Sequence, residues 1–125
     1  MGRPVYNADE ELTLLKRVLQ LHGEFRSSLE SIRVTPLQAG VFLFLRRHAE
    51  ANVTDAATAL RVRVSTLSEV VNDLVRKRWV TECRPVTDSR VVHVRLTRRG
   101  TVLTCQIERR VGRLNTWGFY EVTSI

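Results

Sequence analysis

Five polar residues in the middle of the sequence could form hydrogen bonds with the edges of nucleic-acid bases. An asparagine can pair with adenine through two hydrogen bonds, and a glutamate can accept one from N4 of cytosine. The residues are Ser65, Thr66, Ser68, Glu69 and Asn72. On an isolated helix they would be typical of a solvated face, and Ser65 could equally cap a helix. Their chemistry therefore depends on the elements around them.

Basic side chains flank this segment, and they could bind the phosphate groups of a duplex. Contacts to phosphate oxygens position a protein on DNA without distinguishing its sequence. The candidates are Arg61, Arg63, Arg76, Lys77 and Arg84. For each of them a solvated charge is an equally good interpretation, so no single residue identifies an interface.

The distribution of charge favours a polyanionic partner. The chain has 125 residues, a size typical of one domain, and a formal net charge of +7. Residues 1–60 carry as many basic as acidic side chains, so the whole excess lies in residues 61–125. A one-sided positive field is expected of a protein that binds nucleic acid, although charge alone does not identify the partner.

No pattern in the sequence indicates catalysis or metal binding. There is no Ser/His/Asp or Cys/His constellation, no glycine-rich phosphate loop and no motif of paired carboxylates. The histidines are scattered, and Cys83 and Cys105 lack the spacing of metal ligands. We therefore expect a protein that is not an enzyme and uses no cofactor or metal. The two cysteines are expected to be free thiols, and their sensitivity to oxidants is left open.

Apolar periodicity predicts two helices in the first part of the chain. Apolar residues at intervals of three and four predict an amphipathic helix over residues 8–32, with Asn7 as its cap and Glu10 in capping-box position. The helix is too long for so small a domain to cover, so part of its apolar face is expected to meet another subunit. The motif Thr35-Pro36-Leu37-Gln38 favours the start of a second, buried helix.

Two short helices then form a helix-turn-helix unit. Thr54 and Asp55 are expected to cap the first, and Ser65 the second, after a break at residues 61–64. The second helix has an apolar inner face and a polar outer face. The five candidates for base contacts lie on this helix, which is therefore the predicted recognition helix.

The pattern changes to that of a β-hairpin after residue 78. Residues 79–84 are rich in strand formers, residues 85–89 favour a turn, and residues 92–96 alternate between apolar and polar side chains. A hairpin directly after a helix-turn-helix unit is a wing. Thr97 is then expected to cap a final helix that begins near Arg98 and ends by Leu114.

These motifs resemble those of the MarR family of winged helix-turn-helix transcriptional regulators. The clearest match is Asp88-Ser89-Arg90, followed by Leu96-Thr97 and Gly100, which resembles the wing signature of the family. Thr35-Pro36-Leu37-Gln38 resembles the start of its second helix, and Arg78-Trp79-Val80 resembles its exit from the recognition helix. The resemblance covers about residues 8–112.

Two residues of the predicted wing are further candidates for DNA contacts. Arg90 at the wing tip would enter a minor groove, where narrow A·T tracts concentrate negative potential. Asp88 would restrain Arg90 or another basic side chain by a charge-assisted hydrogen bond, as the resemblance also implies, or would support the turn. The sequence departs from the family pattern at Arg61, where glycine is frequent, and in ending at Ile125, before a further dimerisation helix.

We therefore expect a mainly helical α+β fold, a winged helix-turn-helix with flanking dimerisation helices. Residues 1–125 would form a single domain. Residues 35–97 would be its DNA-binding core, and residues 8–32 and 98–114 its dimerisation helices.

The expected function is that of a regulator of transcription, acting as a repressor. It would bind double-stranded DNA sequence-specifically, as a homodimer on a pseudo-palindromic operator. The resemblance implies release by a small aromatic ligand, with Phe25, Phe42 and Trp79 as contacts that core packing explains equally well. The alternative is a winged-helix module that binds another protein and no operator. Without a signal peptide or a membrane-spanning stretch, the protein is expected in the cytoplasm of a bacterium or archaeon.

Overall fold

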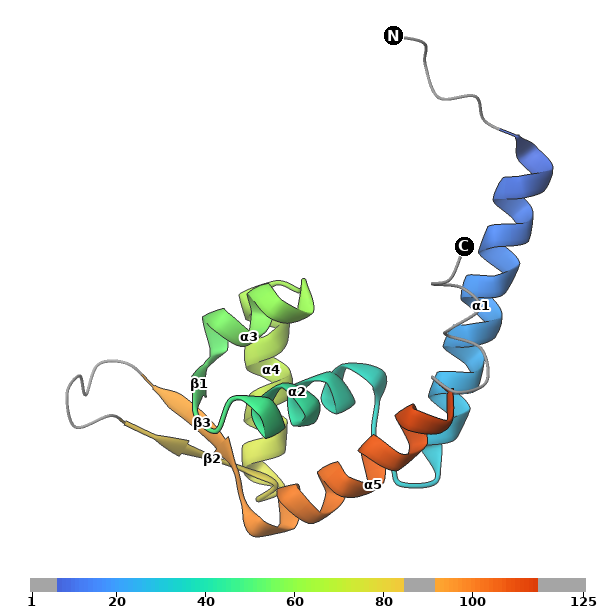
Figure 1. The fold of residues 1–125 in the computed structure, drawn as a ribbon. Coiled ribbons are helices and arrows are strands. Elements are labelled where there is room, and N and C mark those ends of the chain that lie inside the picture. The colour runs from blue at the N-terminus through green and yellow to red at the C-terminus, as the bar shows by residue number, and fades with distance from the viewer. Residues whose placement is uncertain (1–6, 85–91, 115–125) are drawn as a thin grey trace, which may run out of the picture.

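The computed structural model describes residues 7–84 and 92–114, which form a mainly helical domain with a small antiparallel sheet (Figure 1). The elements, in chain order, are α1 (Ala8–Glu30), α2 (Pro36–Arg47), β1 (Ala51–Asn52), α3 (Val53–Leu60), α4 (Val64–Arg76), β2 (Val80–Cys83), β3 (His93–Leu96) and α5 (Arg98–Leu114). The predicted winged helix-turn-helix fold is confirmed. Figure 1 shows α5 running from the sheet to the C-terminal half of α1, whose N-terminal half extends away from the domain.

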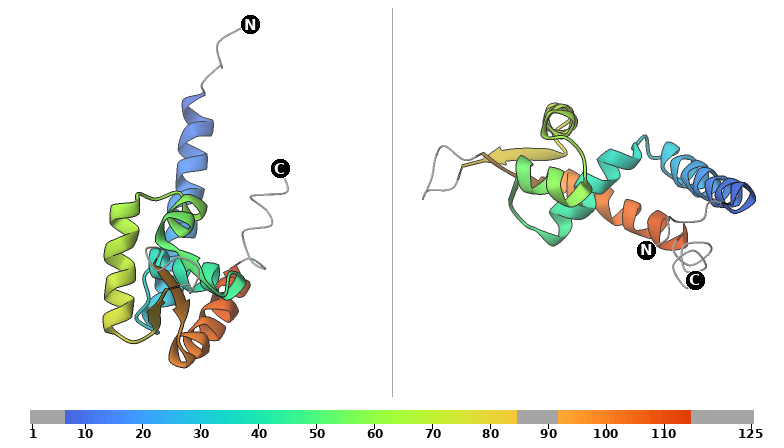
Figure 2. Two further views of the ribbon diagram at one scale, coloured as in Figure 1. Left: turned by 90° about the vertical axis from the view of Figure 1, so that its left-hand side faces the viewer. Right: turned by 90° about the horizontal axis from the view of Figure 1, so that it is seen from above.

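The α1 helix begins as predicted, because the Asn7 side chain accepts hydrogen bonds from the backbone N–H groups of Asp9 and Glu10. Only the last turns of this helix enter the core, where Leu29 is fully buried. Five large apolar side chains of its N-terminal half are 51–59% exposed, namely Leu12, Leu14, Leu15, Val18 and Leu19. Both views in Figure 2 show this half of α1 lying apart from the other helices.

The α2 helix starts with the predicted capping box and passes through the core. The Thr35 hydroxyl accepts from the Gln38 backbone N–H at 3.2 Å, and Gln38 Oε1 accepts from the Thr35 N–H at 3.0 Å. Phe42 is fully buried, and its ring lies 5.9 Å from that of Trp79, in a tilted pair. This contact joins α2 to the segment between α4 and β2.

Two of the predicted helix caps are wrong. Asn52, rather than Thr54 or Asp55, caps α3, because its Oδ1 accepts from the Asp55 N–H at 2.7 Å. The α4 helix begins at Val64 after an extended Arg63, so Ser65 lies inside its first turn and does not cap it. In both cases the helix starts earlier than the sequence indicated, which places the expected cap within the helix.

Three helices end at an arginine in the left-handed conformation, where glycine is usual. Arg33, Arg61 and Arg78 have φ angles of 56°, 57° and 62°. Each is the left-handed residue of a Schellman motif, as the bond from the Val62 N–H to the Ala57 carbonyl illustrates after α3. A β-carbon at such a position costs about 1 kcal/mol. Arg61 is the position at which the family pattern often has glycine, and its positive φ is consistent with that preference.

The sheet has the order β1-β3-β2, with both pairs antiparallel. The predicted hairpin is confirmed in β2 and β3, whose register pairs Val80 with Leu96 and Cys83 with His93. The β1 strand was not predicted, because two residues are too few to show an alternating pattern. The predicted turn at residues 85–89, together with Asp88 and Arg90, lies outside the described residues.

Thr97 and Gly100 join the sheet to α5. The Thr97 hydroxyl donates to the Arg78 carbonyl at 2.7 Å and accepts from the Gly100 N–H at 3.1 Å. The Thr97 N–H also donates to the Trp79 carbonyl, at 3.1 Å. Thr97 therefore caps α5 as predicted, and it also holds the start of α5 against the end of the recognition helix.

Candidate nucleic-acid interface

The predicted helix-turn-helix unit is formed by α3, the turn at residues 61–63 and α4. Arg61 ends α3 in its left-handed conformation, and α4 begins three residues later. The inner face of α4 is buried through Leu67, Val71 and Leu74. This packing fixes which side of α4 remains outside.

The outer face of α4 presents the predicted base-contacting residues. Ser65, Thr66, Glu69 and Asn72 are exposed, and Ser68 is half-buried. Ser65, Glu69 and Asn72 are four and three residues apart, a spacing that aligns side chains along one face of a helix. Figure 2 shows α4 at the outer edge of the domain. The structure thus brings the candidates into one accessible stripe.

Two exposed arginines, Arg61 and Arg63, precede the N-terminus of α4. Its N-cap residue is Arg63, whose side chain has no hydrogen-bond acceptor, so it cannot satisfy the free N–H groups of the first turn. Within residues 7–84 and 92–114, neither Arg61 nor Arg63 has an acidic partner. The free amides and both guanidinium groups therefore produce a positive potential at this end of α4.

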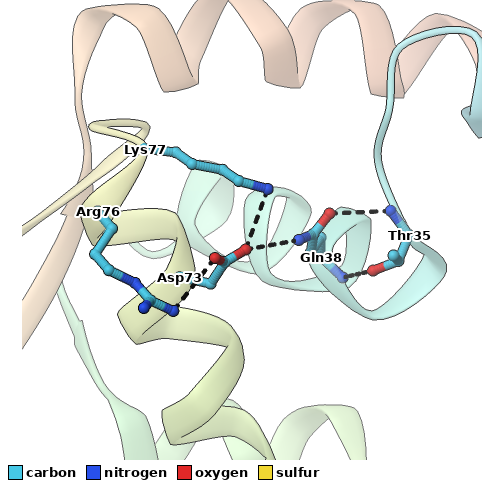
Figure 3. Close-up of polar contacts among 5 residues, drawn as sticks. All are labelled: Thr35, Gln38, Asp73, Arg76 and Lys77. Atoms are coloured by element: carbon cyan, nitrogen blue, oxygen red, sulfur yellow. Dashed lines mark hydrogen bonds and ion pairs between the residues drawn. The ribbon is translucent and has the colours of Figure 1, made fainter.

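The C-terminus of α4 has a different charge arrangement, because both of its candidate cations bind Asp73. Asp73 Oδ1 lies 3.4 Å from Nη2 of Arg76, and Asp73 Oδ2 lies 3.2 Å from Nζ of Lys77 (Figure 3). Asp73 Oδ2 also accepts from Nε2 of Gln38 on α2, at 3.5 Å. The sequence analysis missed this cluster. The spacing of Asp73 from Arg76 and Lys77, three and four residues, is a signal that could have found its ion pairs.

Arg84, the last cation of the predicted set, is exposed at the end of β2.

The thiol of Cys83, on β2, has a raised pKa. Burial raises the pKa, and the carboxylate of Glu50, to which the thiol donates a hydrogen bond, raises it further. These effects outweigh the opposing positive charge of Arg95. A raised pKa leaves less of the reactive thiolate at a given pH.

Phe42 and Trp79, two of the aromatic residues considered for a ligand, differ in their accessibility. Phe42 is fully buried against Trp79, so it belongs to the core. Trp79 is half-buried and lines an open hollow of about 470 Å³ beside the first turns of α5. The other described residues around this hollow are Arg98, Arg99, Val102, Leu103 and Gln106.

Residues 34–91 match the family model described as MarR family. Over these residues the chain is similar to the MarR family. The match contains the second helix and the helix-turn-helix unit, with Thr35-Pro36-Leu37-Gln38, Arg78-Trp79-Val80 and Asp88-Ser89-Arg90 of the sequence resemblance, whereas Leu96, Thr97 and Gly100 lie beyond it. The predicted recognition helix corresponds to α4, which lies inside the matched residues.

Two curated relatives from Bacillus subtilis agree with this assignment. One is an uncharacterised helix-turn-helix transcriptional regulator, YpoP, which is 31% identical over 91 residues, covering 70% of this chain and 62% of YpoP. The other is the transcriptional repressor MdtR, which is 26% identical over 95 residues, covering 76% of this chain and 61% of MdtR. The chain thus spans about three fifths of the length of these relatives. Both are named as regulators and neither as an enzyme, as was expected of this chain.

A solved structure of the same fold contains DNA. It is a mutant of MarR from Escherichia coli complexed with operator DNA, which is 24% identical to this chain and superposes with a TM-score of 0.70. The alignment covers 95% of this chain and 86% of that one. Among the described residues of this chain, no helix has the length and apolar character needed to cross a membrane.

Proposed function

We propose that this chain is a sequence-specific DNA-binding repressor of transcription that acts as a homodimer. One observation carries the proposal. The outer face of α4 presents an exposed stripe of base-complementary side chains, and its N-terminus is preceded by two arginines that have no acidic partner within residues 7–84 and 92–114. A major groove accepts a helix of this kind, with polar side chains directed at base edges and arginines at the phosphates.

The base contacts would come from the stripe on α4. Asn72 has the donor and acceptor pair needed for adenine, and Glu69 can accept from cytosine N4. Ser65 and Thr66 lie in the first turn, and Ser65 is not engaged as an N-cap, so its hydroxyl is available for a base or a phosphate. Ser68, which is half-buried, would contribute at the edge of the stripe.

The phosphate contacts would come from the N-terminal end of α4. Arg61 and Arg63 are exposed there, and the first-turn N–H groups form an anion-binding site of the usual helix type. Arg84 at the base of the wing, and Asp88 and Arg90 beyond it, remain predictions of the sequence. Together these groups would place the wing against the DNA backbone or in a minor groove.

A second copy of the chain would cover the apolar face of α1. Five large apolar side chains on one helix, each more than half exposed, form a surface larger than monomers usually leave in water. Val102 on α5 is also 58% exposed, so the predicted dimerisation helices both offer apolar contacts. A two-fold dimer places two recognition helices about 34 Å apart, one turn of DNA, and thus favours a pseudo-palindromic operator.

A relative supports the repressor role, and a hollow beside Trp79 supports release by a ligand. The relative MdtR is named a repressor, and the E. coli MarR mutant was solved with operator DNA. For release, the hollow beside Trp79 offers an aromatic face and the guanidinium groups of Arg98 and Arg99. This combination suits a small aromatic acid, bound by stacking and by charge-assisted hydrogen bonds.

A selection from a random duplex library, with the wild type and with Asn72→Ala, tests the proposal. We expect enrichment of a pseudo-palindrome whose half-sites are about ten base pairs apart. Asn72→Ala should relax the selection at one base pair of each half-site. If the wild type enriches no sequence and shows no salt-dependent affinity, the regulator function is wrong. The winged-helix module for protein binding would then be the better assignment.

A further inference from the structure

Asp73 divides the cations around α4 into two groups. At the C-terminus of the helix, Arg76 and Lys77 both lie within 3.4 Å of its carboxylate oxygens (Figure 3). At the N-terminus, Arg61 and Arg63 have no acidic partner among the described residues. Only the N-terminal group can therefore bind a phosphate without competition from a neighbouring carboxylate of the described residues.

Gln38 holds the Asp73 carboxylate in place. The Thr35 N–H donates to Gln38 Oε1, which fixes the orientation of the side-chain amide and leaves Nε2 facing Asp73. Gln38 is buried, so this amide belongs to the rigid start of α2. The carboxylate is thereby anchored to α2 and is not free to follow Arg76 or Lys77 toward a ligand.

Lys77 is held from a second side by an aromatic ring. Its Nζ lies 5.3 Å from the centre of the Trp79 ring, and that ring packs on Phe42 in the core. A cation at this distance from an indole face is attracted by the ring quadrupole. Lys77 is therefore held by two groups, the carboxylate of Asp73 and the ring of Trp79.

We propose that Asp73 is a specificity-determining residue that keeps Arg76 and Lys77 from binding DNA phosphates. This inference rests on the proposed function. A phosphate contact raises the affinity for every sequence to a similar extent, and thus favours non-specific binding. Asp73 engages two cations of the recognition helix, and phosphate contacts therefore contribute less to the affinity. The base contacts of that helix then contribute a larger part of the affinity for DNA.

The test replaces Asp73 with an isosteric neutral residue. Asp73→Asn removes the charge, while its side-chain oxygen can still accept the hydrogen bond from Gln38. Glu30→Gln is the control, because it makes the same change in net charge at an exposed position at the end of α1. The dissociation constants for a random duplex and for the selected operator are measured between about 50 and 200 mM salt.

We expect Asp73→Asn to bind the random duplex more tightly than the wild type, with a steeper salt dependence. Each released cation adds about 0.9 to the salt slope. As salt falls across this range, the affinity of Asp73→Asn for the random duplex, relative to that of the wild type, should therefore grow roughly 3-fold for one released cation and roughly 12-fold for two. The ratio of operator to random affinity should fall. Glu30→Gln should keep the wild-type slope and ratio. An unchanged slope in Asp73→Asn would overturn the inference.

A second set of variants does not depend on the stability of Asp73→Asn. With Asp73 intact, Arg76→Gln combined with Lys77→Gln should leave the salt slope close to that of the wild type. If this pair lowers the slope by about 1.8, the two cations already bind phosphates and the inference is wrong. In the Asp73→Asn background, the same pair should remove the added slope. A wild type that binds no duplex would overturn the proposed function itself. That result differs from the two results that would overturn only the inference about Asp73.

Discussion

Gly100 packs so closely on the backbone carbonyl of Trp79 that a β-carbon at this position would overlap the carbonyl oxygen. The contact joins the first turn of α5 to Trp79, which lies in the segment between α4 and β2. The same carbonyl accepts a hydrogen bond from the Thr97 N–H. The threonine and glycine of the wing signature therefore serve one purpose here, the docking of α5 onto the DNA-binding core.

Gly100→Ala should destabilise the protein by about 3 kcal/mol, because the added methyl group meets backbone atoms that cannot move aside. Thermal and urea denaturation followed by circular dichroism measure the change. Gly23→Ala is the control, since a β-carbon at that helical position meets nothing within 4 Å. It should stabilise the protein by about 0.5–1 kcal/mol, through the higher helix propensity of alanine. Equal effects of the two variants would contradict the packing argument.

Replacement of the left-handed arginines by glycine should separate stability from DNA binding. Arg33→Gly and Arg61→Gly remove the same backbone strain, so each should raise the free energy of unfolding by about 1 kcal/mol. Arg33 follows α1 and is not a candidate for DNA contact, whereas Arg61 is. Only Arg61→Gly should therefore weaken DNA binding, with a salt slope shallower by about 0.9. A loss of affinity in both variants would argue against a phosphate contact at Arg61.

Leu15→Glu should convert the proposed dimer into a folded monomer. The side chain is 52% exposed in the single chain, so a carboxylate there is hydrated in the monomer but buried without a partner in the dimer. Light scattering after size exclusion measures the mass, and circular dichroism measures the helix content. Thr13→Glu adds the same charge on the opposite side of α1, as the helical period requires, and should remain dimeric. A wild type of monomeric mass at micromolar concentration would refute the dimer.

Cys83 should react slowly with iodoacetamide near neutral pH, because its raised pKa leaves little thiolate. Glu50→Gln removes the negative charge that opposes ionisation of the thiol, so the pKa should fall and the rate at fixed pH should rise. The rate is followed by mass spectrometry of the Cys83 peptide between about pH 7 and 9.5. Glu82→Gln, on the same strand, should leave the rate unchanged. If the rate does not respond to Glu50→Gln, the carboxylate does not control this thiol.

Local patterns in the sequence determined most of the elements of this fold. The capping box of Thr35 and Gln38 was predicted because its partners are three residues apart, and apolar patterns together with start motifs and expected caps placed all five helices. The cap of α3 was wrong because neighbouring polar residues satisfy the same local rule, and that of α4 because the helix begins after Arg63, a residue that the rule does not favour. Which of them acts as the cap depends on where packing starts the helix, as Asn52 shows for α3.

The candidate site was likewise predicted from the sequence only in part. The sequence alone determined that Ser65, Glu69 and Asn72 share one helical face, because the period of a helix fixes that relation. Only the tertiary structure decided that Asp73 meets Gln38, a contact between residues 35 positions apart, and that β1 pairs with β3. Such contacts form where buried apolar faces bring distant elements together. Their geometry depends on the packing of the whole core, which no local pattern in the sequence contains.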